Sequence, residues 1–240
     1  MLPIGDDNSK RQGLPYINYI LIALNVFVFI FLQKFGKNED FLLSYSMVPD
    51  EILTGKDLIT TDGRGVSPYP VHLTIISAMF MHGSISHLIG NMLYLWVFGD
   101  NLEDKIGHRK YLFFYLLCGL IASISHVAFT AILGRDMFVP SLGASGAISG
   151  VLGGYLMLFP KNRVSVLLLV FVIRIPAFVA LGLWIVWQLY NGYNDVGLAE
   201  GTDAGGVAYA AHVGGFLAGL ILIKLFIKRN PPDVLKTSNF

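Results

Sequence analysis

The sequence GASGAISGVLGG occupies residues 143–154 and begins an apolar segment that reaches residue 160. A segment of this length can cross the hydrocarbon core of a bilayer. Ser145 stands at its start, and a second apolar segment contains His212 within Ala211-His212-Val213-Gly214-Gly215. Because a polar side chain in hydrocarbon is costly unless it has a partner or a function, we take Ser145 and His212 as a candidate nucleophile and its base.

The composition of the whole chain is typical of a polytopic membrane protein. Of its 240 residues, 54% are hydrophobic and 14% are charged, whereas a soluble domain has about 25% charged residues. The net charge is +1 and no basic run is present, which argues against nucleic acid as a partner.

Six apolar segments predict an all-α, six-span bundle in the lipid bilayer. We place the spans at about 17–33, 74–98, 110–133, 144–160, 176–190 and 206–227. The fifth is the least distinct, because the apolar run 164–190 contains Arg174 and Pro176. We expect a short apolar surface segment at 164–173 and a helix that begins near Pro176, since proline suits the first turn of a helix. One long tilted helix is the alternative.

The segment 34–72 is a long and more polar first loop. Its apolar pieces, Phe41-Leu42-Leu43 and Ile52-Leu53, are typical of short amphipathic helices at a membrane surface. Lys and Arg residues gather on the other side of the predicted bundle, namely Lys10, Arg11, Lys105, Arg109, Lys110, Lys161, Arg163, Lys228 and Arg229. By the positive-inside rule, the N- and C-termini are then cytoplasmic and the loop is external.

These boundaries divide the chain into a cytoplasmic N-terminal segment (1–16), a membrane domain (17–228) and a cytoplasmic tail (229–240). The N-terminal segment is not rich in Arg or Ser, as a mitochondrial transit peptide would be. We therefore expect a multi-pass integral protein of a cell membrane, either the plasma membrane or an inner membrane.

Five polar side chains fall at one depth in this topology. Ser145 opens the fourth span and His212 lies about six residues into the sixth, while His82, His87 and Asn91 lie in the outer half of the second. At 1.5 Å per residue, all five are in the outer half of the bilayer. This convergence indicates one shared site.

Two ladders of small residues indicate which spans meet at that site. They are Gly146, Gly150 and Gly154 in the fourth span, and Ala211, Gly215 and Gly219 in the sixth. Small residues four apart let helix backbones approach closely. His212 would then remove the hydroxyl proton as Ser145 attacks a carbonyl. No Asp or Glu lies near His212 within the spans, which predicts a Ser-His dyad.

The second span offers donors for an oxyanion. His87 and Asn91 are four residues apart and share one helical face. The Asn91 amide, a ring N–H of His87 and the backbone N–H of Ser145 form a candidate oxyanion hole. The same donors, with the positive end of a helix dipole beside Ser145, suit a tetrahedral intermediate.

At these residues the chain resembles the rhomboid family of intramembrane serine proteases. The matching motifs are Gly-x-Ser-Gly at 143–146, Ala-His-x-Gly-Gly at 211–215, His-x4-His-x3-Asn at 82–91, and Gly99-Asp100-Asn101-Leu102-Glu103 followed by Gly107. The resemblance covers about residues 17–228. It implies a six-helix core, Ser145 as nucleophile, His212 as base, His87 and Asn91 at the oxyanion, His82 as support for them, and transmembrane proteins as substrates.

Two departures from the family pattern stand out. Some members have an aromatic residue four positions after the nucleophile, which packs on the catalytic histidine; here that residue is Ser149. Tyr209 or Tyr155 would have to orient His212 instead. Some members also carry a Trp-Arg pair in the first loop, and this chain has no Trp there.

Three other interpretations remain open at this point. A non-catalytic protein of the same fold would bind transmembrane helices without cutting them. A small-solute channel or transporter would use the buried histidines as relay groups. A zinc site at His82, His87 and His212 lacks the acidic base that a metalloprotease requires, so we expect no metal and no cofactor.

Overall fold

A computed structural model describes residues 2–58, 63, 65–197 and 208–227. The predicted tail at 229–240 and the first residues of the predicted sixth span lie outside the described residues. The elements in chain order are β1 (Leu2–Asp6), α1 (Tyr16–Phe27) with a π-helical extension η1 (Val28–Leu32), α2 (Glu39–Tyr45), α3 (Pro49–Thr54), η2 (Val71–Leu73), α4 (Thr74–Ala78), α5 (Ile85–Ile106), α6 (His108–Leu133), α7 (Ser145–Leu158), β2 (Arg163–Leu168), β3 (Phe171–Pro176), α8 (Ala177–Gly197) and α9 (Tyr209–Phe226).

Each predicted span corresponds to a helix, but the second is displaced. The segment 74–98 is broken, because α4 ends at Ala78 and α5 begins at Ile85 and continues to Ile106. Ser84 sets that start, since its hydroxyl accepts a hydrogen bond from the backbone N–H of His87 at 3.1 Å. In the described part of the chain, α6 and α9 are the two helices long and apolar enough to cross a membrane. The count of six spans therefore stays a prediction.

The prediction of an all-α fold is wrong in one respect, because the chain forms an antiparallel sheet with strand order β1-β2-β3. In β2, Val164 and Val166 are buried and their neighbours are less so, which is the period-two pattern of a strand. Leu2 of β1 pairs with Leu167 of β2. The apolar surface segment expected at 164–173 is thus a hairpin, and α8 begins directly after Pro176, as expected.

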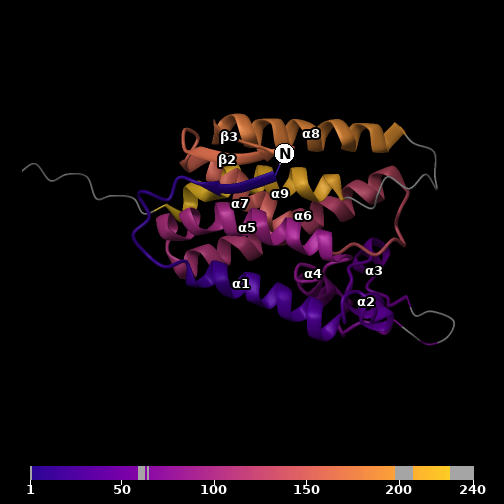
Figure 1. Cartoon of the computed structure of the whole chain (residues 1–240). Helices are drawn as coiled ribbons and strands as arrows, with labels where there is room; N and C mark the ends of the chain where they lie inside the picture. The colour runs from indigo at the N-terminus through magenta and orange to yellow at the C-terminus, as the bar shows by residue number, and fades with distance from the viewer. Residues whose placement is uncertain (1, 59–62, 64, 198–207, 228–240) are drawn as a thin grey trace, which may run out of the picture.

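The two short helices expected in the first loop are present as α2 and α3, and their place at a membrane surface stays a prediction. Figure 1 shows the long helices side by side, with α1 and α8 at opposite edges and the sheet close to α8. Helices α2, α3 and α4 gather at one end of the molecule. Helix α7 forms the centre, because every residue from Gly146 to Tyr155 is buried.

Helices α7 and α9 touch backbone to backbone through glycine. A Cβ atom at Gly215 would lie 2.2 Å from the carbonyl oxygen of Gly146, so no larger residue fits there without a shift. The predicted ladders are confirmed, with one correction. Gly154 faces Phe114 of α6, and Gly153 takes its place against α9. This contact brings the start of α7 close to the start of α9.

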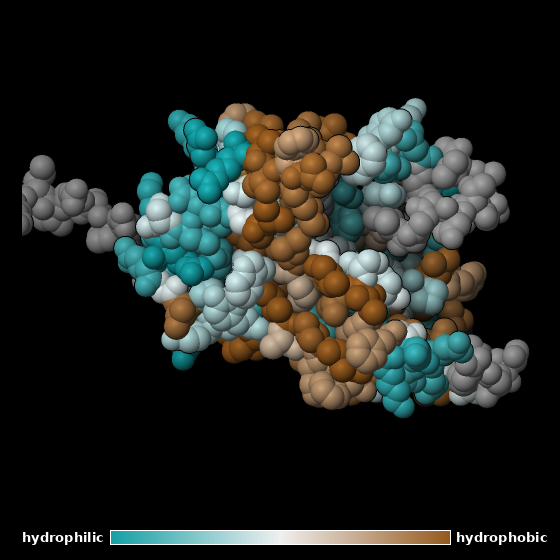
Figure 2. Space-filling view, in the orientation of Figure 1, coloured by the Kyte–Doolittle hydropathy of each residue, from teal (hydrophilic) through white to brown (hydrophobic). Residues whose placement is uncertain are grey.

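The outer surface suits a bilayer. Figure 2 shows hydrophobic residues in a band across the middle of the molecule and hydrophilic residues towards both ends. Many large apolar side chains are exposed, among them Phe31 of η1 and Val186 of α8. Such a surface is unfavourable in water and is expected where lipid covers it, so the chain is a membrane protein.

The strand β1 is fastened to the helices through Asp6. One carboxylate oxygen of Asp6 accepts hydrogen bonds from the Tyr155 hydroxyl (2.5 Å) and from the Asn101 amide (2.7 Å). Nearby, Arg11 forms an ion pair with Asp100. Burial raises the pKa of Asp6 to about 6. Tyr155, near the far end of α7 from Ser145, is therefore engaged by the N-terminal strand.

Candidate active site

The side chains of Ser145 and His212 meet between α7 and α9. The Oγ atom of Ser145 lies 2.7 Å from Nε2 of His212, which is hydrogen-bond distance. Ser145 is the first residue of α7, and His212 lies in the first turn of α9. The glycine contact between these helices holds the two side chains together.

The loop before Ser145 depends on Gly143. Its φ angle is +135°, which L side chains rarely adopt. A Cβ atom there would lie 3.1 Å from Nε2 of His87, closer than ordinary contact. The backbone N–H of Gly143 donates to the carbonyl of Ala78 at 2.9 Å. Gly143 thus lets the chain turn into α7 while the His87 ring stays beside Ser145.

The second ring nitrogen of His212 is held by a residue of α8. Nδ1 of His212 lies 2.8 Å from Oε1 of Gln188. The ring of Tyr209 lies edge-on to His212 at 6.4 Å between centroids, so this expected partner does touch the imidazole. Tyr155, the other expected partner, does not, because its hydroxyl is bonded to Asp6.

The side chain of Ser149 makes its hydrogen bond within its own helix, α7. Its hydroxyl donates to the carbonyl oxygen of Ser145 at 2.6 Å, so it does not replace the aromatic residue seen in some relatives. Trp184 of α8 is a neighbour of His212 instead, with ring centroids 6.1 Å apart. The imidazole is thus flanked by Trp184, Tyr209 and Gln188.

Two of the predicted oxyanion residues line a cavity with Ser145 and His212. The cavity has a volume of about 710 Å³, and both His87 and Asn91 of α5 face it. Asn91 is 8% exposed, and within the described residues its side-chain nitrogen has no hydrogen-bond partner. A buried N–H group without a partner is rare, and here it is available to a ligand in the cavity.

His82 lies behind this layer. It is fully buried, does not line the cavity, and stands at a steep angle to the His87 ring at 5.1 Å between centroids. Gln33 fixes its backbone, accepting from the N–H at 2.9 Å and donating to the carbonyl at 2.8 Å. His82 therefore packs against His87 and does not reach the cavity. Within the described residues, no three His, Cys, Asp or Glu side chains are grouped as metal ligands.

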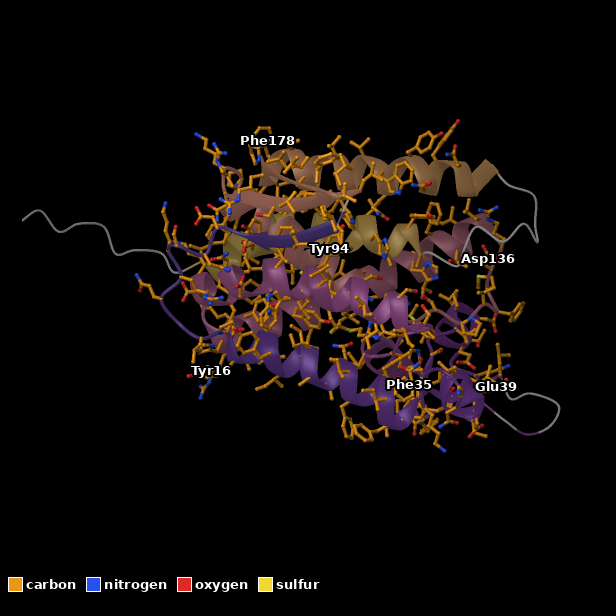
Figure 3. The ribbon with its side chains drawn as sticks, in the orientation of Figure 1. Tyr16, Phe35, Glu39, Tyr94, Asp136 and Phe178 are labelled. Carbon is orange, nitrogen blue, oxygen red and sulfur yellow. The ribbon has the colours of Figure 1, made fainter. Side chains whose placement is uncertain are left out.

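The cavity continues along the gap between α5 and α8. A second cavity of about 560 Å³ shares Tyr94, Trp184 and Gln188 with the first and reaches Pro3 and Val166 of the sheet. Figure 3 shows Tyr94 on α5, on the side that faces the sheet and α8. The site thus opens into an apolar groove that leads from Ser145 towards the sheet.

The sequence reasoning did not identify Gln188 or Trp184 as residues of the site. A signal for Gln188 was present, because it is a polar residue in the apolar run 164–190 and is 8% exposed. The argument that singled out Ser145 and His212 applies equally to that amide.

Comparison with known proteins places these features in a family. The rhomboid domain model matches residues 71–229. Rhomboid protein 1, mitochondrial, of Saccharomyces cerevisiae is 30% identical over 85% of this chain and 51% of its own length. Presenilin-associated rhomboid-like protein A, mitochondrial, of Danio rerio is 30% identical over 62% of this chain and 36% of its own length. Rhomboid protease GluP of Bacillus subtilis is 28% identical over 64% of this chain and 26% of its own length. The chain spans about half or less of the length of these relatives.

The expected location in a plasma or inner cell membrane is wrong by this comparison, because the yeast and zebrafish relatives are both mitochondrial proteins. The expectation rested on the composition of residues 1–16, which concerns targeting. The Lys and Arg asymmetry orients spans in a membrane but does not say which membrane it is.

Two findings agree on the family. The domain model covers 159 of the 240 residues, from 71 to 229, and includes Ser145 and His212. The yeast relative matches across most of the chain. The chain belongs to the rhomboid family.

Proposed function

We propose that the chain is an intramembrane serine endopeptidase that cuts transmembrane segments of other membrane proteins. The observation that carries the proposal is the 2.7 Å contact between Ser145 Oγ and His212 Nε2 beside a 710 Å³ cavity. A relative that bears the name of a protease, GluP, supports it. The proposed catalytic unit is the membrane domain, residues 17–228.

In the proposed reaction, Ser145 Oγ attacks the carbonyl carbon of the scissile peptide bond. Its proton moves to Nε2 of His212, which then delivers it to the nitrogen of the leaving amine as the C–N bond breaks. Water in the cavity attacks the resulting ester, and the proton passes through His212 back to Ser145. The dyad is thus regenerated without any cofactor.

The oxyanion of the tetrahedral intermediate needs preorganised donors. Asn91 suits this role, because its side-chain N–H groups are buried, unpartnered and face the cavity. The ring of His87 lines the same cavity. The first turn of α7 adds backbone N–H groups that lack intrahelical acceptors. His82 would support His87 by packing.

The groove between α5 and α8 suits an apolar, membrane-embedded substrate. It is lined by Tyr94, Leu181 and Trp184 on its way to the sheet. A substrate helix must unwind locally before its carbonyl is attacked, because its backbone is hydrogen-bonded internally. We therefore propose substrates with helix-breaking residues near the cut. The yeast and zebrafish relatives support a mitochondrial membrane as the setting.

The hydrogen-bonded dyad also separates this proposal from a purely binding or transport role. A protein that only grips helices gains nothing from a serine aligned on an imidazole nitrogen, and a solute pathway needs no oxyanion donor.

The test is cleavage by the purified chain in liposomes of a single-span protein with a helix-breaking segment. We expect one cut within the span, lost in Ser145→Ala and in His212→Ala. Ser123→Ala is the control, because this α6 serine lines a small pocket beside the dyad and is not among the residues that line the main cavity. Cleavage by Ser145→Ala at the wild-type rate would refute the proposal.

A further inference from the structure

Among the described side chains, Gln188 alone is hydrogen-bonded to Nδ1 of His212, the ring nitrogen that faces away from Ser145. It is buried at 8% exposure in α8, and its Oε1 lies 2.8 Å from Nδ1 of His212. The opposite ring nitrogen, Nε2, faces Ser145 Oγ at 2.7 Å. Three side chains from three helices, α7, α9 and α8, therefore form one chain of hydrogen bonds.

The chemistry of an amide oxygen decides where the protons lie in this series of hydrogen bonds from Ser145 through His212 to Gln188. A carbonyl oxygen only accepts, so a contact between Oε1 and Nδ1 requires the proton to be on Nδ1. A neutral imidazole carries one N–H, so Nε2 is then left with its lone pair. That lone pair is the acceptor that the Ser145 hydroxyl needs. The opposite amide orientation would place the proton on Nε2 and leave His212 unable to act as a base.

We infer that Gln188 is a positioning residue, which holds His212 in the reactive tautomer and fixes its ring towards Ser145. This inference rests on the proposed function and supplies what the dyad lacks, a group that orients the base. In Ser-His-Asp enzymes, a carboxylate takes this place, and the wrong tautomer costs about 10⁴-fold in rate. Gln188 gives the same orientation without a negative charge.

The neutral amide of Gln188 suits the surroundings of His212. The described titratable groups that face His212 are His87 from α5, His126 from α6 and Tyr209 from its own helix. A buried carboxylate at position 188 would need desolvation and would leave charge in an apolar groove. An amide provides the hydrogen bond at a lower cost, because it is neutral in both states of the dyad.

A direct test follows the tautomer without relying on activity. Nitrogen-15 spectra of histidine-labelled protein in nanodiscs distinguish Nδ1–H from Nε2–H, and the His212 signals are identified by their loss in His212→Gln. We expect the proton on Nδ1 in the wild type and a mixture of tautomers in Gln188→Leu. A wild-type proton on Nε2, or the same spectrum in both proteins, would overturn the inference.

Kinetics supply the second test. For Gln188→Leu we expect kcat to fall by about 10- to 100-fold with KM within about twofold, because orientation of the base is lost while the cavity stays apolar. Asn191→Ala is the matched control, since that amide of α8 bonds to the carbonyl of Trp187 in its own helix. Equal losses in kcat for both variants would assign Gln188 a structural role only.

Gln188→Glu keeps the inference testable even if the leucine variant does not fold. The carboxylate accepts the same N–H and stabilises the protonated imidazole, so the acidic limb of the pH–rate profile should move to higher pH, by about one unit. An unmoved limb would contradict the inference. Cleavage by Ser145→Ala would instead refute the proposed function, and the spectra would still decide whether Gln188 sets the tautomer.

Discussion

A Cβ atom added to Gly219 of α9 would lie 2.0 Å from the carbonyl oxygen of Gly150 in α7. The two helices are therefore in backbone contact one to two turns below the dyad. Because the helices are rigid, this contact sets how far His212 stands from Ser145. Packing at a position that touches neither side chain is thus coupled to the geometry of the Ser145–His212 pair.

Gly219→Ala should therefore impair activity as well as folding. Overpacking of this kind costs about 1–3 kcal/mol, and a shift of about 1 Å between reacting groups costs about 100-fold in rate. The measurements are the thermal unfolding midpoint and the cleavage rate. Gly182→Ala is the control, because its Cβ would meet nothing within 4 Å. Equal behaviour of the two variants would contradict this account.

Gly143→Ala should lose activity beyond its loss of stability. The new methyl group would press on Nε2 of His87 at 3.1 Å and strain a backbone with φ of +135°. Gly134→Ala is the control for strain alone, since its φ is +65° and nothing lies within 4 Å. We expect both variants to be less stable by about 1–3 kcal/mol, with cleavage reduced at least tenfold only in Gly143→Ala. Normal cleavage by Gly143→Ala would show that the position of the His87 ring does not matter to the reaction.

Asn91→Ala should lower kcat by about 10²- to 10³-fold, the usual cost of one oxyanion donor. Its buried side-chain nitrogen has no hydrogen-bond partner among the described residues, so the thermal unfolding midpoint should fall little beside the loss in rate. Ser86→Ala, on the same helix and in the same cavity, removes a hydroxyl whose hydrogen-bond partner among the described residues is Ser84. A rate loss of similar size in Ser86→Ala would show that the cavity, rather than Asn91, is sensitive.

Sequence reasoning recovered the parts of this structure that follow from local pattern. Apolar runs located the helices, and glycine spacing identified the contact of α7 with α9. It placed Ser145 and His212 at one depth, and the structure brings their side chains together. These features depend on periodicity and on the cost of polar groups in hydrocarbon, which a single sequence displays.

The sheet and the orientation of His212 could not be predicted in the same way. Leu2 and Leu167 pair across most of the chain's length, and no local pattern announces a partner so distant in sequence. The aromatic residue expected near His212 led to Tyr209 and Tyr155, whereas an amide from α8 makes the hydrogen bond. Helix α5 starts later than expected because a single serine cap outweighed the apolar pattern.

The docking of β1 should weaken as the pH rises. Burial raises the pKa of Asp6 to about 6 from 3.8, so the folded state prefers the protonated acid. The stability that this gives is complete below about pH 4 and is lost as the pH rises through 6. Asp6→Asn should therefore gain thermal stability over the wild type between pH 5 and 8, by about 1–2 kcal/mol after allowance for partial exposure.

Asp7→Asn provides the control for this prediction. Hydrogen bonds from Ser9 lower the pKa of exposed Asp7, so that carboxylate is ionised throughout pH 5 to 8. Its variant should differ from the wild type by a constant amount across the range. A constant difference for Asp6→Asn as well would contradict the buried-acid account of the strand.

The most direct test of the central claim is covalent labelling by a fluorophosphonate, which reacts with a serine activated by a neighbouring base. Purified chain in detergent or liposomes should acquire one adduct, and peptide mass spectrometry should locate it at Ser145. The adduct should be absent in Ser145→Ala and strongly reduced in His212→Ala. No adduct on the folded wild-type protein, or an adduct at another residue that persists in Ser145→Ala, would contradict the assignment of Ser145 and His212 as a catalytic dyad.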